Sequence, residues 1–247
     1  MKTKEIKLNK KVARKVLEIV DKGLVNGLGV AKPGKMCVEA AVCYALGLPH
    51  GDKPQCVGQE VREFKIALND ASWSSDKART KGLRKLAIAQ LGSDTLNQGE
   101  FTKNLGFKCM TKVLPIIVEN AIEEDKDNEF VKKYKLDLPK LKMLAKKLRN
   151  AKDFDSAKEL AQQIRDVYYA SASASAYAYA YAYASASAYA SASAYASASA
   201  YAYAYASAYA KKNAPFIDKV LNLVAKAGLD TLIEMKSPGV KWLDLTR

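Results

Sequence analysis

A strictly alternating segment without charge is the strongest constraint that this sequence places on its own folding. From Ala170 to Ala210 every even position is Ala, and every odd position from Tyr169 to Tyr209 is Ser or Tyr. A period of two is the period of a β-strand, which would place Ala on one face and Ser or Tyr on the other. The segment must either pair as a strand or adopt another conformation that tolerates this alternation.

Length argues against a strand within a single chain. At about 3.3 Å per residue the segment would extend roughly 135 Å, and it contains no Gly, Pro, Asn or Asp to fold it into hairpins. β-structure would therefore need other chains, as in the silk-like Ala/Ser/Tyr blocks that the segment resembles in composition only. A helix needs no partner, because half of the residues are Ala, the best helix former, and the rod would be roughly 60 Å long.

A helix with this pattern has a surface suited to self-association. Residues i and i+4 share parity, so rows of Ala and rows of Ser or Tyr run separately along it. The Ala rows let a second backbone approach closely, and we expect a homo-oligomer or filament. The expected contact residues are Tyr177, Tyr179, Tyr181, Tyr183, Tyr189, Tyr195, Tyr201, Tyr203, Tyr205 and Tyr209. A neutral spacer helix and a flexible or intermolecular β-segment are the alternatives.

Outside this segment apolar residues recur at the helical period, and strand signals are sparse. The predicted helices cover residues 9–24, 35–46, 57–68, 76–91, 100–124 with a kink near Pro115, 139–148, 156–168, 215–228 and 232–235. The predicted fold class is all-α. A compact N-terminal helical domain at 1–168 is followed by the long Ala/Ser/Tyr helix at 169–210 and a short C-terminal helical element at 211–247.

The formal net charge of +14 is concentrated in two regions. Residues 132–152 hold nine Lys or Arg against one acid, and residues 1–35 hold ten against three. Focused positive charge favours polyanions, so nonspecific nucleic-acid binding is our alternative function. The candidate residues form two basic helix faces, Lys77, Lys81, Arg84 and Lys85, and Lys140, Lys142, Lys146, Lys147 and Arg149. The competing interpretation is a set of solvated helix faces.

Four cysteines accompany a Lys-rich N-terminus that lacks the apolar core of a secretory signal. We therefore expect reduced thiols and a cytoplasmic location. Cys37, Cys43, Cys56 and His50 could be imagined as a zinc site. However, Cys37 and Cys43 are six residues apart on one predicted helix, about 600° around its axis, so they do not share a face. We expect no metal and no cofactor.

Buried apolar thiols are the favoured interpretation of these cysteines. Cys37 is also a candidate nucleophile, because a thiol in the first turn of a helix has a lowered pKa, with His50, the single His, as its base. Glu39 on the same predicted helix is interpreted as the buried partner of a Lys or Arg.

No phosphate-binding, dinucleotide-binding, zinc-protease or serine-hydrolase motif is present in the sequence. We therefore expect no enzymatic activity. The longest strongly apolar run, residues 113–118, is far too short to cross a bilayer, so no membrane span is expected.

Three stretches carry a family resemblance. They read MCVEAAVCYALGLPHGD at 36–52, FKIALNDASWSS at 64–75 and ARTKGLRKLAIAQLGS at 78–93. These stretches resemble a family of uncharacterised bacterial and phage-encoded proteins over about a quarter of the chain. The resemblance implies a bacterial or phage origin and an Ala-rich tract after the helical domain, and it implies no activity.

Overall fold

The computed structural model describes residues 8–125, 137–171 and 214–247. These ranges are helical apart from loops and one isolated antiparallel bridge between Gly29 and Met36, which confirms the all-α prediction. The predicted long helix at 169–210 lies outside the described residues from residue 172 onward. None of the described helices is both long and apolar enough to cross a bilayer.

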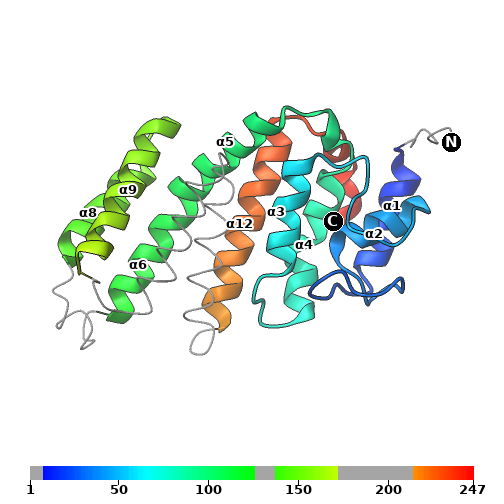
Figure 1. Cartoon of the computed structure of the whole chain (residues 1–247), viewed down its shortest axis with the longest axis horizontal. Coiled ribbons are helices and arrows are strands. Elements are labelled where there is room, and N and C mark those ends of the chain that lie inside the picture. The colour runs from blue at the N-terminus through cyan, green and yellow to red at the C-terminus, as the bar shows by residue number, and fades with distance from the viewer. Residues whose placement is uncertain (1–7, 126–136, 172–213) are drawn as a thin grey trace. The chain divides into compact units, whose positions relative to one another are not determined.

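The chain divides into two compact units (Figure 1). Unit 1 comprises residues 1–101 and 214–247, and unit 2 comprises residues 102–213. Unit 1 contains helices α1 (Lys10–Val20), α2 (Val38–Leu46), α3 (Gln59–Asn69), α4 (Asp76–Ala89) and α12 (Ala214–Glu234), and 3₁₀ segments η1 (Ser93–Thr95) and η3 (Pro238–Thr246). Unit 2 contains η2 (Cys109–Val113), α6 (Leu114–Asp125), α8 (Leu138–Arg149) and α9 (Phe154–Ser171). The boundary between the units falls within α5 (Gln98–Lys108).

Helix starts follow side-chain caps. Oδ1 of Asn9 accepts a hydrogen bond from the Val12 amide at 3.0 Å, and Oγ of Ser75 accepts one from the Ala78 amide at 3.1 Å. Each contact satisfies an amide that has no partner inside its helix. α4 therefore starts at Asp76, as the sequence predicts, and α1 starts at Lys10, one residue after the predicted start.

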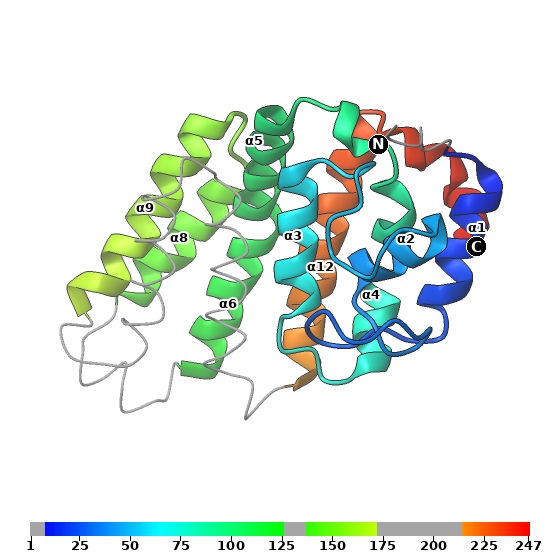
Figure 2. The same cartoon turned by 45° about the vertical axis from the view of Figure 1, so that its right-hand side comes forward.

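One prediction about the C-terminal helix is wrong. We expected this helix to end near Gly228, yet α12 continues to Glu234 and includes most of the separate short helix predicted at 232–235. α12 lies alongside α4 and α3 (Figure 1 and Figure 2). A Cβ at position 228 would overlap the buried ring of Phe64 on α3. Gly228 therefore allows a close approach between two helices, and it does not end one.

The segment after α12 is fastened to the N-terminal helices of unit 1. Oγ of Ser237 donates to the Ala89 carbonyl at 2.6 Å, and Nζ of Lys10 lies 2.7 Å from Oδ2 of Asp244. Trp242 on η3 is buried. Composition suggested a separate element at 211–247, whereas these contacts place residues 214–247 in the same unit as residues 1–101.

The predicted single helix at 100–124 is three segments, because the π-helix η2 separates α5 from α6. Pro115 has no N–H, and in a regular α-helix its ring collides with the carbonyl four residues earlier. A π-turn widens the helix and relieves such a conflict. We expected a kink at Pro115 itself. The structure instead has the irregularity in the turn that precedes Pro115.

Unit 2 has its own apolar core, which lies between α6, α8 and α9. It is formed by the buried residues Leu114, Val118, Leu141, Leu144, Ala145, Leu148, Ala157, Ala161, Ile164 and Val167. The four core residues of α8 repeat at three- and four-residue intervals, which is the helical period that the sequence shows there.

Candidate functional site

The ten tyrosines of the predicted self-association surface, Tyr177 to Tyr209, lie outside the described residues. The structure describes the first residues of their segment and the helix that follows it. α9 continues as a helix through residues 169–171, the first three of the alternating pattern. α12 begins at Ala214, four residues after the pattern ends.

On α4, the predicted basic face keeps three of its four cations at the surface. Lys77, Lys81 and Lys85 are exposed. Arg84 differs, because its Nε and Nη2 donate to the two carboxylate oxygens of Asp21 at 2.6 and 3.0 Å, and its Nη1 donates to the Thr246 carbonyl at 2.8 Å. The hydrogen bonds that Arg84 donates to Asp21 raise the pKa of Arg84. Arg84 is therefore a structural cross-link.

The basic face of α8 is exposed at every predicted position. All five lie outside the buried stripe formed by the four core residues of this helix; they are Lys140, Lys142, Lys146, Lys147 and Arg149. Nη2 of Arg149 donates to Oε2 of Glu119 on α6 at 2.8 Å. Within the described part of the chain, the four lysines have no ion-pair partner.

A fully buried ion pair joins α2 to α3. Nζ of Lys65 lies 3.0 Å from Oε1 of Glu39, and neither side chain is exposed. Gln90, which caps the C-terminus of α4, is buried beside Glu39. The prediction that Glu39 is the buried partner of a basic residue is confirmed. Sequence reasoning missed Lys65, although it lies four residues after Val61 and three before Leu68 on the apolar side of α3.

The energetics of this pair are dominated by the loss of solvent. Burial raises the pKa of Glu39 and lowers the pKa of Lys65, and the attraction between the two charges opposes both shifts. Removing two charges from water costs several kcal/mol for each ion, by order of magnitude, and only close contact offsets it. The pair therefore depends on α2 and α3 being held at one separation.

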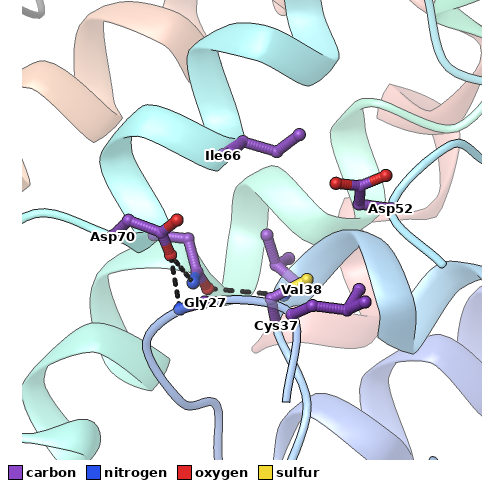
Figure 3. Close-up of a pocket in the computed structure, with 8 residues that line it drawn as sticks. Gly27, Cys37, Val38, Asp52, Ile66 and Asp70 are labelled. Carbon is purple, nitrogen blue, oxygen red and sulfur yellow. Dashed lines mark hydrogen bonds between the residues drawn. The ribbon is translucent and has the colours of Figure 1, made fainter. Parts of the chain in front are cut away.

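A small cavity lies between α3 and the loop that precedes α2 (Figure 3). Its volume is about 40 Å³, and its lining includes Cys37, Asp52, Ile66 and Asp70. Oδ1 of Asp70 accepts hydrogen bonds from the amide of Gly27 and from Nδ2 of Asn69, both at 2.8 Å. These polar groups fasten the loop to α3. The cavity has room for about three water molecules, which is far below the roughly 300 Å³ of the smallest ligand pockets.

Cys37 does not have the lowered pKa expected of a nucleophile. It is the N-cap of α2, and its Sγ accepts from the Ala40 amide at 3.4 Å. Burial nevertheless raises the pKa of this thiol, because desolvation outweighs the backbone hydrogen bonds. The prediction of a lowered pKa is therefore wrong.

The other cysteines behave in the same way. Burial raises the pKa of Cys43 to about 12, of Cys56 to about 11 and of Cys109 to about 12. All four cysteines are free and buried, which confirms their interpretation as apolar thiols.

His50 contacts the backbone of the loop around the Gly29–Met36 bridge. Its Nε2 lies 3.1 Å from the Gly29 carbonyl, and a carbonyl only accepts, so Nε2 is the donor. Among the described residues, no group of three or more His, Cys, Asp or Glu is arranged to hold a metal ion.

No protein-family model, curated protein or solved structure matches this chain. The resemblance of residues 36–93 to bacterial and phage-encoded proteins therefore stays a prediction.

Substitutions test the buried ion pair. We expect Lys65→Met alone to lower the free energy of unfolding by about 3–5 kcal/mol, because it leaves the buried Glu39 without its counter-charge. The double variant Glu39→Leu/Lys65→Met should recover most of this loss or exceed the wild-type stability, since no charge then stays buried. Urea denaturation followed by circular dichroism measures both.

The matched control is Asp230→Ala, which breaks the exposed Lys226–Asp230 pair on α12, 2.9 Å long. Its cost should stay below about 1 kcal/mol. If Lys65→Met lowers the free energy of unfolding by no more than this control does, the interpretation of Glu39 and Lys65 as a buried ion pair is contradicted.

Thiol reactivity tests the raised pKa values. At about pH 8 we expect the native chain to react with a thiol reagent at least about a hundredfold more slowly than the chain unfolded in guanidinium, because buried thiols stay protonated. Above about pH 9 the unfolded chain releases thiol protons that the folded chain retains, so the free energy of unfolding should fall as pH rises. Labelling of native Cys37 at the rate of a free thiol would restore the nucleophile interpretation.

Proposed function

We propose that this protein is a non-enzymatic structural protein that self-associates into a homo-oligomer or filament through the Ala/Ser/Tyr segment at 169–210. The observation that carries the proposal is the alternation, which is unbroken and uncharged from Ala170 to Ala210. A segment without charge presents no electrostatic repulsion to its copies, although the whole chain carries +14. The segment is therefore the part of the chain best suited to contact a second copy.

The edges of the segment support a helical form of this surface. The first three residues of the pattern belong to α9, so the alternation does not prevent a helix at that end. Both flanking helices belong to folded units, α9 to unit 2 and α12 to unit 1. A segment attached at both ends has less conformational freedom than a free tail, which reduces the entropy that association removes.

The tyrosines supply enough surface for a stable contact. A buried Tyr removes about 150–250 Å² from water, and stable interfaces bury about 800 Å² on each partner. Five or six of the ten tyrosines would therefore provide most of one side. Ala rows between them allow the backbones to approach closely, and i,i+4 pairs such as Tyr177 and Tyr181 would present adjacent rings.

The proposal places this assembly in the cytoplasm, which is supported by four cysteines that are all free thiols. A bacterial or phage origin is proposed on the sequence resemblance of residues 36–93 alone.

Nonspecific binding of nucleic acid is the second candidate function. The observation in its favour is the exposure of seven basic-face lysines, three on α4 and four on α8. Such lysines neutralise phosphates and release counterions, so the binding would weaken steeply with salt.

Sedimentation velocity of the full chain tests self-association. We expect the wild type to form oligomers at both low and high salt, because the contact is uncharged. Replacing all ten tyrosines by Ser keeps the length, the alternation and the zero charge of the segment, and should shift the protein to monomer.

Replacing the same tyrosines by Phe is the matched control. It keeps the rings and should keep the oligomer. A wild type that stays monomeric at high concentration, or a Tyr→Ser variant that associates as the wild type does, would contradict the proposal.

A further inference from the structure

The exposed side of α8 has an ordered arrangement of charge. Residues seven apart on a helix lie almost directly above one another, about 10.5 Å apart along the axis. Lys140 and Lys147 therefore line one edge of the exposed side, and Lys142 and Arg149 line the other. Met143, which is 45% exposed, and the exposed Lys146 lie between the two edges. The helix thus presents two parallel rows of cations, with a fifth cation, Lys146, between them.

The cations of α8 are available to a partner, whereas the face of α4 is partly neutralised. On α4 the bidentate pair with Asp21 neutralises Arg84, which leaves three lysines of the predicted face, and Asp76 on the same helix is paired with Arg79. On α8, counting partners among the described residues, Arg149 alone of the five predicted cations is paired, through Glu119, and four lysines stay unpaired. The positive charge that is free to meet phosphates is therefore greatest on α8.

α8 is also held in place as a rigid element. Oδ1 of Asp137 caps its N-terminus by accepting from the Lys140 amide at 2.9 Å. Its opposite side is buried in the core of unit 2 through Leu141, Leu144 and Leu148. Lysines on such a helix keep fixed spacing, so they can meet phosphates without ordering a flexible segment first.

We infer that the exposed side of α8 docks in the major groove of duplex DNA, with Lys140 and Lys147 on phosphates of one strand and Lys142 on the other. This inference rests on the nucleic-acid function proposed above and assigns its surface. An α-helix is about 10–12 Å across, and the major groove of B-DNA is about 12 Å wide. Two rows of cations on one helix therefore match the two phosphate backbones that border this groove.

The same side chains argue against other nucleic acids. The exposed side of α8 carries no aromatic residue, so it offers nothing for the bases of a single strand to stack on. The major groove of A-form RNA is deep and too narrow to be read by protein side chains. Duplex DNA is therefore the partner that this helix fits.

Fluorescence anisotropy with a labelled DNA duplex tests the inference on the full chain. The test variant is Lys140→Gln/Lys142→Gln/Lys147→Gln, and the matched control on α4 is Lys77→Gln/Lys81→Gln/Lys85→Gln. Each removes three positive charges, and Gln keeps about the helix propensity of Lys. Circular dichroism and thermal unfolding check that both variants stay folded.

We expect the α8 variant to bind at least about tenfold more weakly at about 100 mM salt. Its plot of log K against log salt should be shallower by up to about 2.7, which is about 0.9 for each lost phosphate contact. The α4 variant should change affinity by less than about threefold and keep the wild-type slope. Replacing the three α8 lysines by Arg should retain binding, since the charges are kept.

The outcomes separate the inference from the function on which it rests. A wild type that does not bind the duplex at low salt rejects the nucleic-acid function itself. Wild-type binding with equal losses in the α4 and α8 variants, or with no loss in the α8 variant, overturns the assignment to α8 alone. Tighter binding to double-stranded RNA, to single-stranded DNA or to vesicles of anionic lipid than to the duplex also overturns it.

Discussion

The core of unit 1 is closed by the C-terminal segment of the chain. Gly228 lets α12 approach the Phe64 ring, and Ser237 donates to the carbonyl of Ala89 at the end of α4. Residues 102–213 are consequently an insertion between two parts of one folded unit. The Ala/Ser/Tyr segment, which lies at the C-terminal end of this insertion, is joined to folded structure on both sides. Its proposed role in assembly is that of an anchored segment and not of a free tail.

The buried Glu39–Lys65 pair imposes a second constraint within the same unit. Apolar residues at both positions would tolerate small shifts of α2 against α3. Two buried charges would not, because their attraction offsets the free-energy cost of desolvation only when they are in close contact. We interpret the pair as a device that selects one arrangement of these helices. Desolvation is the main cause of the raised pKa values of Cys37 and Cys43, and the negative charge of Glu39 raises both further because it disfavours a nearby thiolate.

Local signals allowed the helices to be predicted, and tertiary contacts account for the errors. Capping by Ser75 is a short-range interaction, so the start of α4 is readable from the sequence. The role of Gly228 depends on Phe64, which lies 164 residues earlier in the sequence. The role of Arg84 also depends on a residue distant in the sequence, because its pairing with Asp21 removes it from the basic face that its spacing predicts. The lysines of α8 were predictable because their exposure follows from the apolar period of that helix alone.

Native-state hydrogen exchange can show whether residues 214–247 and the N-terminal helices form one cooperative core. We predict that the slowest amides of α12 exchange with the same opening free energy as the slowest amides of α1 and α4, equal to that of global unfolding. If the α12 amides opened at a much lower free energy while α4 stayed protected, the C-terminal helix would be an accessory element outside the cooperative core.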